Sequence, residues 1–208
     1  MGMDWNAQND SDTAVLNRID RSPLDASLVE GNEQLASLVE QHNADLAELE
    51  ARIRQLTDER AAMVHAEDLY VCNSGAVRAG HRHLVDESWD VLVTLRKLLG
   101  QREAILSQME EHVATRWNDL REQRGEALAK AEKALAREHR SYVKAEPLRG
   151  QAYVEELATN DEAVTALNQR IAELDAVDDR LYTLRHKAQL ADSALTRRQR
   201  EILAHLVS

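Results

Sequence analysis

Between Ser74 and Glu146, apolar side chains recur at three- and four-residue steps over roughly seventy residues that contain no proline. Residues three and four apart share one face of an α-helix, whereas residues two apart share one face of a strand. The segment therefore predicts one long helix. Its apolar positions are Val77, Leu84, Leu92, Leu95, Leu99, Leu106, Met109, Val113, Trp117, Leu120, Leu128, Ala131, Leu135 and Tyr142.

One part of this central helix, from Leu84 to Leu99, is apolar on more than one face. A helix with that pattern is surrounded by protein. Either flanking helices of the same chain or a second copy of the chain would provide the cover. Because apolar surface left uncovered marks a contact site, we take Val85, Trp89 and Val93 as candidate partner contacts.

Two further helices are predicted around the central one. Ser22 and Pro23 form a helix-start signal, and apolar residues at helical spacing follow it as far as Met63, with His42 as a polar residue on the seam. The Cys72–Gly75 and Glu146–Gly150 segments interrupt the pattern. The predicted helices are about 22–72, 74–146 and 151–207, and Thr159 with Glu162 predicts a break in the third.

Long helices joined by short connections favour an antiparallel arrangement. We therefore expect an all-α fold, an elongated antiparallel helical hairpin or three-helix bundle with coiled-coil character. This bundle spans residues 22–208, and residues 1–21 form a flexible acidic arm. The composition agrees, because only 3% of the residues are aromatic and there are two prolines.

The net charge of −11 is unevenly distributed. Residues 1–72 hold 15 acidic and 5 basic side chains, a net of −10, and the remainder is close to neutral. The acidic part is unsuited to binding duplex nucleic acid or anionic lipid. No apolar run is long enough to span a membrane, the first residues do not resemble a signal peptide, and there is one cysteine, so we expect a cytoplasmic protein.

The sequence contains no recognisable catalytic, cofactor-binding or metal-binding constellation. No histidine follows a glutamate by three residues, as a di-iron bundle requires. Glycine loops for phosphate and strand-borne nucleophiles are also absent. One cysteine and three histidines gather near the first connection, but their spacing matches no compact zinc unit: they are His65, Cys72, His81 and His83. We therefore expect a protein that is not an enzyme.

Near its end the sequence reads LTRRQREILAHL, from Leu195 to Leu206. This segment resembles the opening helix of several bacterial helix-turn-helix DNA-binding domains. Reading of bases depends on a second helix, and the sequence ends at Ser208. The resemblance therefore implies DNA binding only if the native chain continues. Basic residues near a helix C-terminus otherwise complement the helix dipole.

Two hypotheses about function follow. The first is a non-enzymatic coiled-coil structural or adaptor protein that spaces or joins protein partners, a second copy of itself included, in a larger assembly. The second is a nucleic-acid-associated regulator that uses its basic C-terminal helix. The contact candidates are Trp5, Val85, Trp89, Val93, Arg197, Arg198 and Arg200. Partner identity and oligomeric state do not follow from the sequence.

Overall fold

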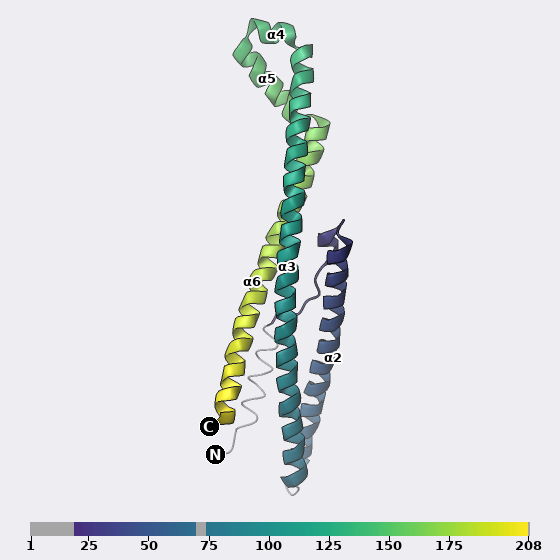
Figure 1. Cartoon of the computed structure of the whole chain (residues 1–208), viewed down its shortest axis with the longest axis vertical. Coiled ribbons are helices and arrows are strands. Elements are labelled where there is room, and N and C mark those ends of the chain that lie inside the picture. The colour runs from purple at the N-terminus through teal and green to yellow at the C-terminus, as the bar shows by residue number, and fades with distance from the viewer. Residues whose placement is uncertain (1–18, 70–73, 208) are drawn as a thin grey trace. The chain divides into compact units, whose positions relative to one another are not determined.

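The structure is a computed structural model. It describes the backbone of residues 19–69 and 74–207 and the side chains of residues 19–62 and 86–200. Within these residues every regular element is helical, and no strand occurs, which confirms the predicted all-α class. The elements are η1 (Ala26–Val29), α2 (Glu33–Leu69), α3 (Ser74–Glu138), α4 (Arg140–Ala145), α5 (Pro147–Thr159) and α6 (Glu162–Val207) (Figure 1).

The chain forms two compact units. Unit 1 comprises Met1–Gln108 and Thr183–Ser208, and unit 2 comprises Met109–Tyr182. The long helices α3 and α6 each contribute one part to each unit. Among the described residues, no helix is both long enough and apolar enough to cross a bilayer.

Unit 1 has its core where α2, α3 and α6 meet. The apolar stripe of each helix is buried there, as the three- and four-residue spacing predicts. The part of α3 around Leu95 is covered from two sides by the other helices, which accounts for its apolar residues on more than one face. The buried cluster consists of Ile19, Leu46, Leu49, Leu56, Val91, Leu92, Leu95, Leu98, Leu99, Ala191 and Leu195.

The first helix begins later than the sequence pattern indicates. Residues 21–25 have no regular structure, and α2 starts at Glu33, with the Asn32 side chain accepting a hydrogen bond of 3.0 Å from the Leu35 amide. Before it, Asp25 caps the short η1 helix, and Gly31 has a φ of 85°, a conformation that suits glycine. Ser22 and Pro23 therefore lie in an irregular segment before η1 and do not begin the first long helix.

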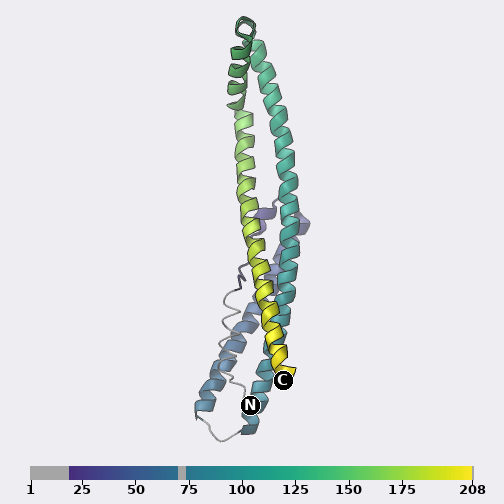
Figure 2. The same ribbon diagram turned by 90° about the vertical axis from the view of Figure 1, so that its left-hand side faces the viewer.

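Unit 2 is a helical hairpin in which α3 and α6 run side by side in opposite directions, as Figures 1 and 2 show. Trp117 Nε1 on α3 donates a hydrogen bond to Asp175 Oδ1 on α6 at 2.9 Å. Further along α3, Arg124 bonds to Asn168, which precedes Asp175 on α6. The two helices are therefore antiparallel. The seam between the helices buries a narrow apolar stripe that includes Val113, Ala131, Val164 and Leu174.

The connections of the helices agree in part with the sequence pattern. Ser74 begins α3, and a break separates α5 from α6 at residues 160–161, both as predicted. The central helix ends at Glu138, however, and not at Glu146, because the chain turns through α4 before Pro147 opens α5. The predicted turn at Asn73 lies outside the described residues.

Candidate functional site

The tip of unit 2 is built by the short helices α4 and α5, which connect the end of α3 to the start of α6. Pro147 stands at the first position of α5, where its missing amide hydrogen costs nothing. The Glu146 amide donates to the Tyr142 carbonyl at 3.0 Å, and the Gly150 amide donates to the Glu146 carbonyl at 2.7 Å. These bonds link the two short helices through the single residue between them.

The two short helices approach each other most closely at Gly150, which is buried. A β-carbon placed on Gly150 would lie 2.6 Å from the Cα atom of Val143, inside normal contact distance. Only glycine fits there without displacing backbone. The sequence marks Gly150 as part of an interruption, but the close approach itself is a tertiary feature.

Three rings gather at the same tip. The ring centroids of His139 and Tyr153 are 5.5 Å apart at an interplanar angle of 83°, and those of Tyr142 and Tyr153 are 5.7 Å apart at 69°. Both pairs have the edge-to-face geometry that aromatic rings favour. Because Tyr142 and Tyr153 are each 41% exposed, the cluster presents aromatic surface to solvent.

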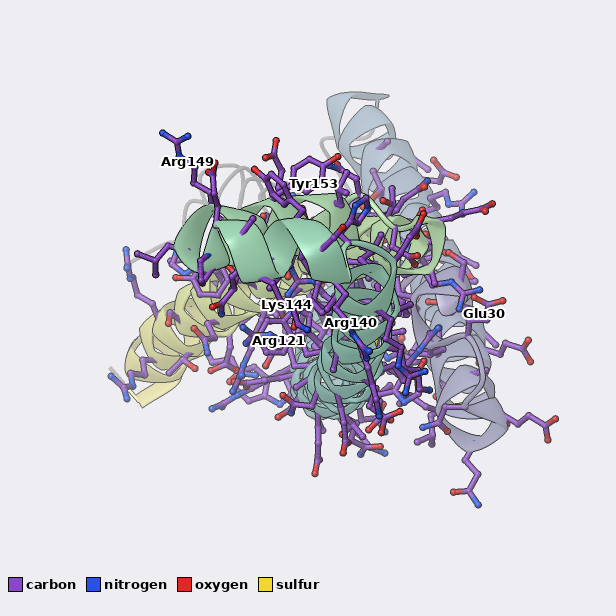
Figure 3. All side chains as sticks on the ribbon, turned by 90° about the horizontal axis from the view of Figure 1, so that it is seen from above. Glu30, Arg121, Arg140, Lys144, Arg149 and Tyr153 are labelled. Carbon is purple, nitrogen blue, oxygen red and sulfur yellow. The ribbon has the colours of Figure 1, made fainter. Side chains whose placement is uncertain are left out.

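Helix α5 also carries the most exposed large apolar side chain among the described residues, Leu148, with 87% of its surface accessible. The basic side chains of Arg140, Lys144 and Arg149 are exposed on the same two helices. Figure 3 shows Arg149 pointing away from the ribbon on one side of the two short helices, and Arg140 and Lys144 on the other side. We call the set Arg140, Tyr142, Lys144, Leu148, Arg149 and Tyr153 the tip surface.

The two short helices of the tip carry charges of both signs. Residues 140–159 contain three basic and three acidic side chains, whereas residues 133–149, which include the end of α3, have a net charge of +3. Arg149 lies 3.4 Å from Glu146, while Arg140 and Lys144 have no ion pair with a described residue. The surface can thus offer positive charge and apolar contact together.

A second polar site lies in unit 1, where the strap of residues 19–25 crosses the helices. Lys187 Nζ of α6 lies 3.2 Å from Asp20 Oδ2, and Arg102 Nη1 of α3 donates to the Ser22 carbonyl at 2.6 Å. The Asn43 side chain of α2 both accepts from the Leu24 amide, at 2.8 Å, and donates to its carbonyl, at 2.9 Å. The strap is therefore bonded to all three helices of the unit.

Asp20, in the strap, and His42, on α2, have shifted pKa values. Burial alone would raise the pKa of Asp20, but hydrogen bonds from Ser22 and the nearby Lys187 outweigh it and bring the pKa to about 2. His42 is buried, and neither of its ring nitrogens has a partner among the described residues. Burial, together with the charge of Arg102, lowers the pKa of His42, so its neutral form is favoured.

The contact candidates chosen from the sequence differ in exposure. Trp5 lies outside the described residues, as does the side chain of Val85. In unit 1, Trp89 is partly buried against the core and Val93 is 44% exposed. Arg197 and Arg200 are exposed, but Arg198 is buried.

Among the described residues, no group of three or more His, Cys, Asp or Glu side chains is arranged to hold a metal ion. The side chains of His65, Cys72, His81 and His83 lie outside the described part of the chain.

Sequence reasoning missed the tip surface and the strap. The charge of residues 133–149 and the position of Leu148 directly after Pro147 were available as signals for the tip. Comparisons with family models, with curated proteins and with solved structures find no match to this chain.

Proposed function

We propose that this chain is a non-enzymatic structural or adaptor protein that joins protein partners in a larger assembly. The observation that carries the proposal is the tip surface, because the two short helices α4 and α5 together expose an almost fully accessible leucine, two half-exposed tyrosines and three cations. Exposed apolar side chains that cluster are a mark of protein–protein contact sites, whereas single ones need no explanation. Tyrosine and arginine are also the residue types enriched at such interfaces.

The remaining helix surface supports this proposal, because most apolar side chains of the stripes in both units are buried between helices of the same unit. In unit 1 Trp89 packs against the buried cluster of α2, α3 and α6, and Val93 is the single exposed large apolar residue among the side chains described near it on α3. The seam of unit 2 is likewise occupied by α3 and α6. Among the side chains that the structure describes, more apolar residues are thus exposed at the tip than around Trp89.

A nucleic-acid role through the basic end of α6 has less support. The side chain of Arg198 is buried, and Gln199 beside it accepts a hydrogen bond of 2.9 Å from Arg96. Two exposed arginines, Arg197 and Arg200, remain from the proposed contact set. Affinity for duplex DNA comes largely from several phosphate contacts acting together, so we favour protein partners.

The test is partner capture from the native source with the tagged full-length chain. We expect Leu148→Ser to lose at least one specifically captured protein, a second copy of the chain included, because the substitution removes the apolar centre of the tip surface. The matched control is Leu190→Ser, since Leu190 is also exposed, at 59%, but lies on α6 in unit 1. Circular dichroism checks that both variants keep their helices.

The proposal fails if Leu148→Ser and Leu190→Ser capture the same proteins in the same amounts as the unaltered chain. It also fails if the unaltered chain captures no more than an unrelated acidic protein of equal net charge.

A further inference from the structure

The part of α3 that belongs to unit 2 carries two blocks of opposite charge on one face. Six charged residues follow one another there at steps of three or four, so they lie along one side of the helix. The first three are acidic and the last three are basic. They are Asp119, Glu122, Glu126, Lys130, Lys133 and Arg137, and we call them the two-block face.

The two-block face points away from α6. Glu122 is two residues from Arg124, which bonds to Asn168 of α6. Lys133 is likewise two residues from Ala131, which is buried in the seam. Residues two apart on a helix project to nearly opposite sides. All six side chains of the two-block face are exposed, and none forms a hydrogen bond or an ion pair with another described residue.

Within each block, like charges are neighbours. Of the five successive pairs along the face, four join side chains of the same sign, and one, Glu126 with Lys130, joins opposite signs. Like charges three or four residues apart destabilise a helix, and opposite charges stabilise it. Alternating signs are typical of a helix face that only meets solvent. The blocks are therefore unfavourable in the isolated chain, and a surface with the inverse pattern would relieve them.

We propose that the two-block face binds the same face of a second copy of this chain, with the two α3 helices antiparallel. A two-fold axis at Leu128 then sets the acidic block of each copy against the basic block of the other. Such a contact is self-complementary, as a two-fold interface must be. The opposed pairs are all centred on Leu128 to within one residue: Asp119 with Arg137, Glu122 with Lys133, and Glu126 with Lys130.

The charge pattern favours a second copy over a nucleic acid or a lipid surface. A phosphate backbone or an anionic bilayer would attract the basic block and repel the acidic block beside it. A parallel second copy would set like charges against each other. An antiparallel copy neutralises both blocks at once, and the charges also fix the register of the two helices.

The test is sedimentation equilibrium of the purified full chain over a range of concentrations. Exposed ion pairs are individually weak, so we expect an association of modest affinity that salt disrupts. At about 10 mM NaCl the average mass should exceed that of the 23.5 kDa monomer, and at about 1 M NaCl it should return toward the monomer, because the screening length falls from about 30 Å to about 3 Å.

Charge reversal locates the contact and its register. Glu122→Lys with Glu126→Lys, and separately Lys130→Glu with Lys133→Glu, should each weaken self-association roughly tenfold or more, because side chains of like sign then meet. All four changes in one chain should restore self-association. The net charge then equals that of the unaltered chain, and the reversed blocks again oppose each other across the two-fold axis.

The controls make the same changes of net charge elsewhere. Glu173→Lys with Asp178→Lys, and separately Lys97→Glu with Arg170→Glu, alter exposed residues outside the two-block face and should leave self-association unchanged. Circular dichroism checks that every variant keeps its helices. Leu148→Ser should also associate normally, because the tip surface has no part in this contact. The inference is thus independent of the adaptor function proposed above.

The inference is overturned if the unaltered chain stays monomeric at low salt, or if either double variant of the two-block face associates as well as the unaltered chain. It is also overturned if the folded fourfold variant stays monomeric, or if the controls weaken association equally. Binding of single-stranded DNA, phosphatidylserine vesicles or a different protein by a monomer, lost in Lys130→Glu with Lys133→Glu, would assign the face to that ligand and overturn it as well.

Discussion

Gly150 lies against Val143 with no space for a side chain between them, and this contact fixes how α5 packs on α4. An added β-carbon would meet the Cα atom of Val143 at 2.6 Å. Backbone cannot yield as a flexible side-chain end can, so the tip must rearrange to accept any larger residue. The position of Leu148 and of the three rings depends on this packing.

Gly150→Ala is therefore expected to destabilise the tip by about 1–3 kcal/mol, the usual cost of overpacking a tight site. Hydrogen exchange should show faster exchange of the amides of α4 and α5, while α2 remains protected. The near-ultraviolet circular dichroism of the tyrosines should change as well.

Gly125→Ala is the matched control for this substitution. Gly125 is also a helix residue, but a β-carbon placed on it meets nothing within 4 Å. Alanine there should stabilise α3 by about 1 kcal/mol through helix propensity. Equal effects of the two substitutions on unit 2 would contradict the close packing of α4 on α5.

Asn43→Ala is expected to loosen the strap. The substitution removes both hydrogen bonds to the backbone of Leu24 and leaves two part-buried polar groups without a partner, at a cost of about 1–3 kcal/mol. Exchange of the Leu24 amide should accelerate, and the urea midpoint should fall.

The control is Gln55→Ala. It removes an exposed hydrogen bond to Glu59 within α2, so it should cost no more than about 0.5 kcal/mol. A protected Leu24 amide in Asn43→Ala would show that the strap is held by other contacts.

Asp20 links the strap to acid stability. Its pKa is lowered from 3.8 to about 2 in the folded chain, so its ionised form favours folding. This contribution is complete above pH 3.8 and is lost as the pH falls from there through about 2. Asp20→Asn should lower the free energy of unfolding by at most about 2 kcal/mol near neutral pH, since the group is partly exposed. The difference from the unaltered chain should shrink toward pH 2, and a constant difference in urea titrations would refute the linkage.

The all-α fold could be predicted from the sequence because its signals are local. A three- and four-residue apolar period specifies a helix wherever it occurs, and residues such as Ser74 and Thr159 stand at helix ends. The cover around Leu95 followed from the same pattern, since apolar residues on several faces require several neighbours.

What the sequence did not predict depends on contacts between distant residues. Ser22 and Pro23 form a sound local helix start, yet the strap is held in place by Asn43 and Arg102, which are 19 and 80 residues away from their partners. The tip surface depends on the packing of Gly150 on Val143, which no periodicity encodes. Arg198 was chosen as a contact by charge alone, and its burial follows from the packing of α6.

His42 should make unit 1 sensitive to pH between neutrality and mild acid. The side chain is buried, its ring nitrogens have no partner among the described residues, and Arg102 lies close enough to oppose a second positive charge, so its pKa falls below 6.5. The unfolded chain then binds more protons than the folded chain once the pH drops below 6.5, and stability decreases as the pH falls further toward the folded pKa.

His42→Leu removes this difference and should flatten the dependence of the urea midpoint on pH across that range. His186→Leu alters an exposed histidine and should leave the dependence unchanged. Ring proton signals in nuclear magnetic resonance measure the site directly, and a His42 that titrates at or above 6.5 would contradict the buried neutral state.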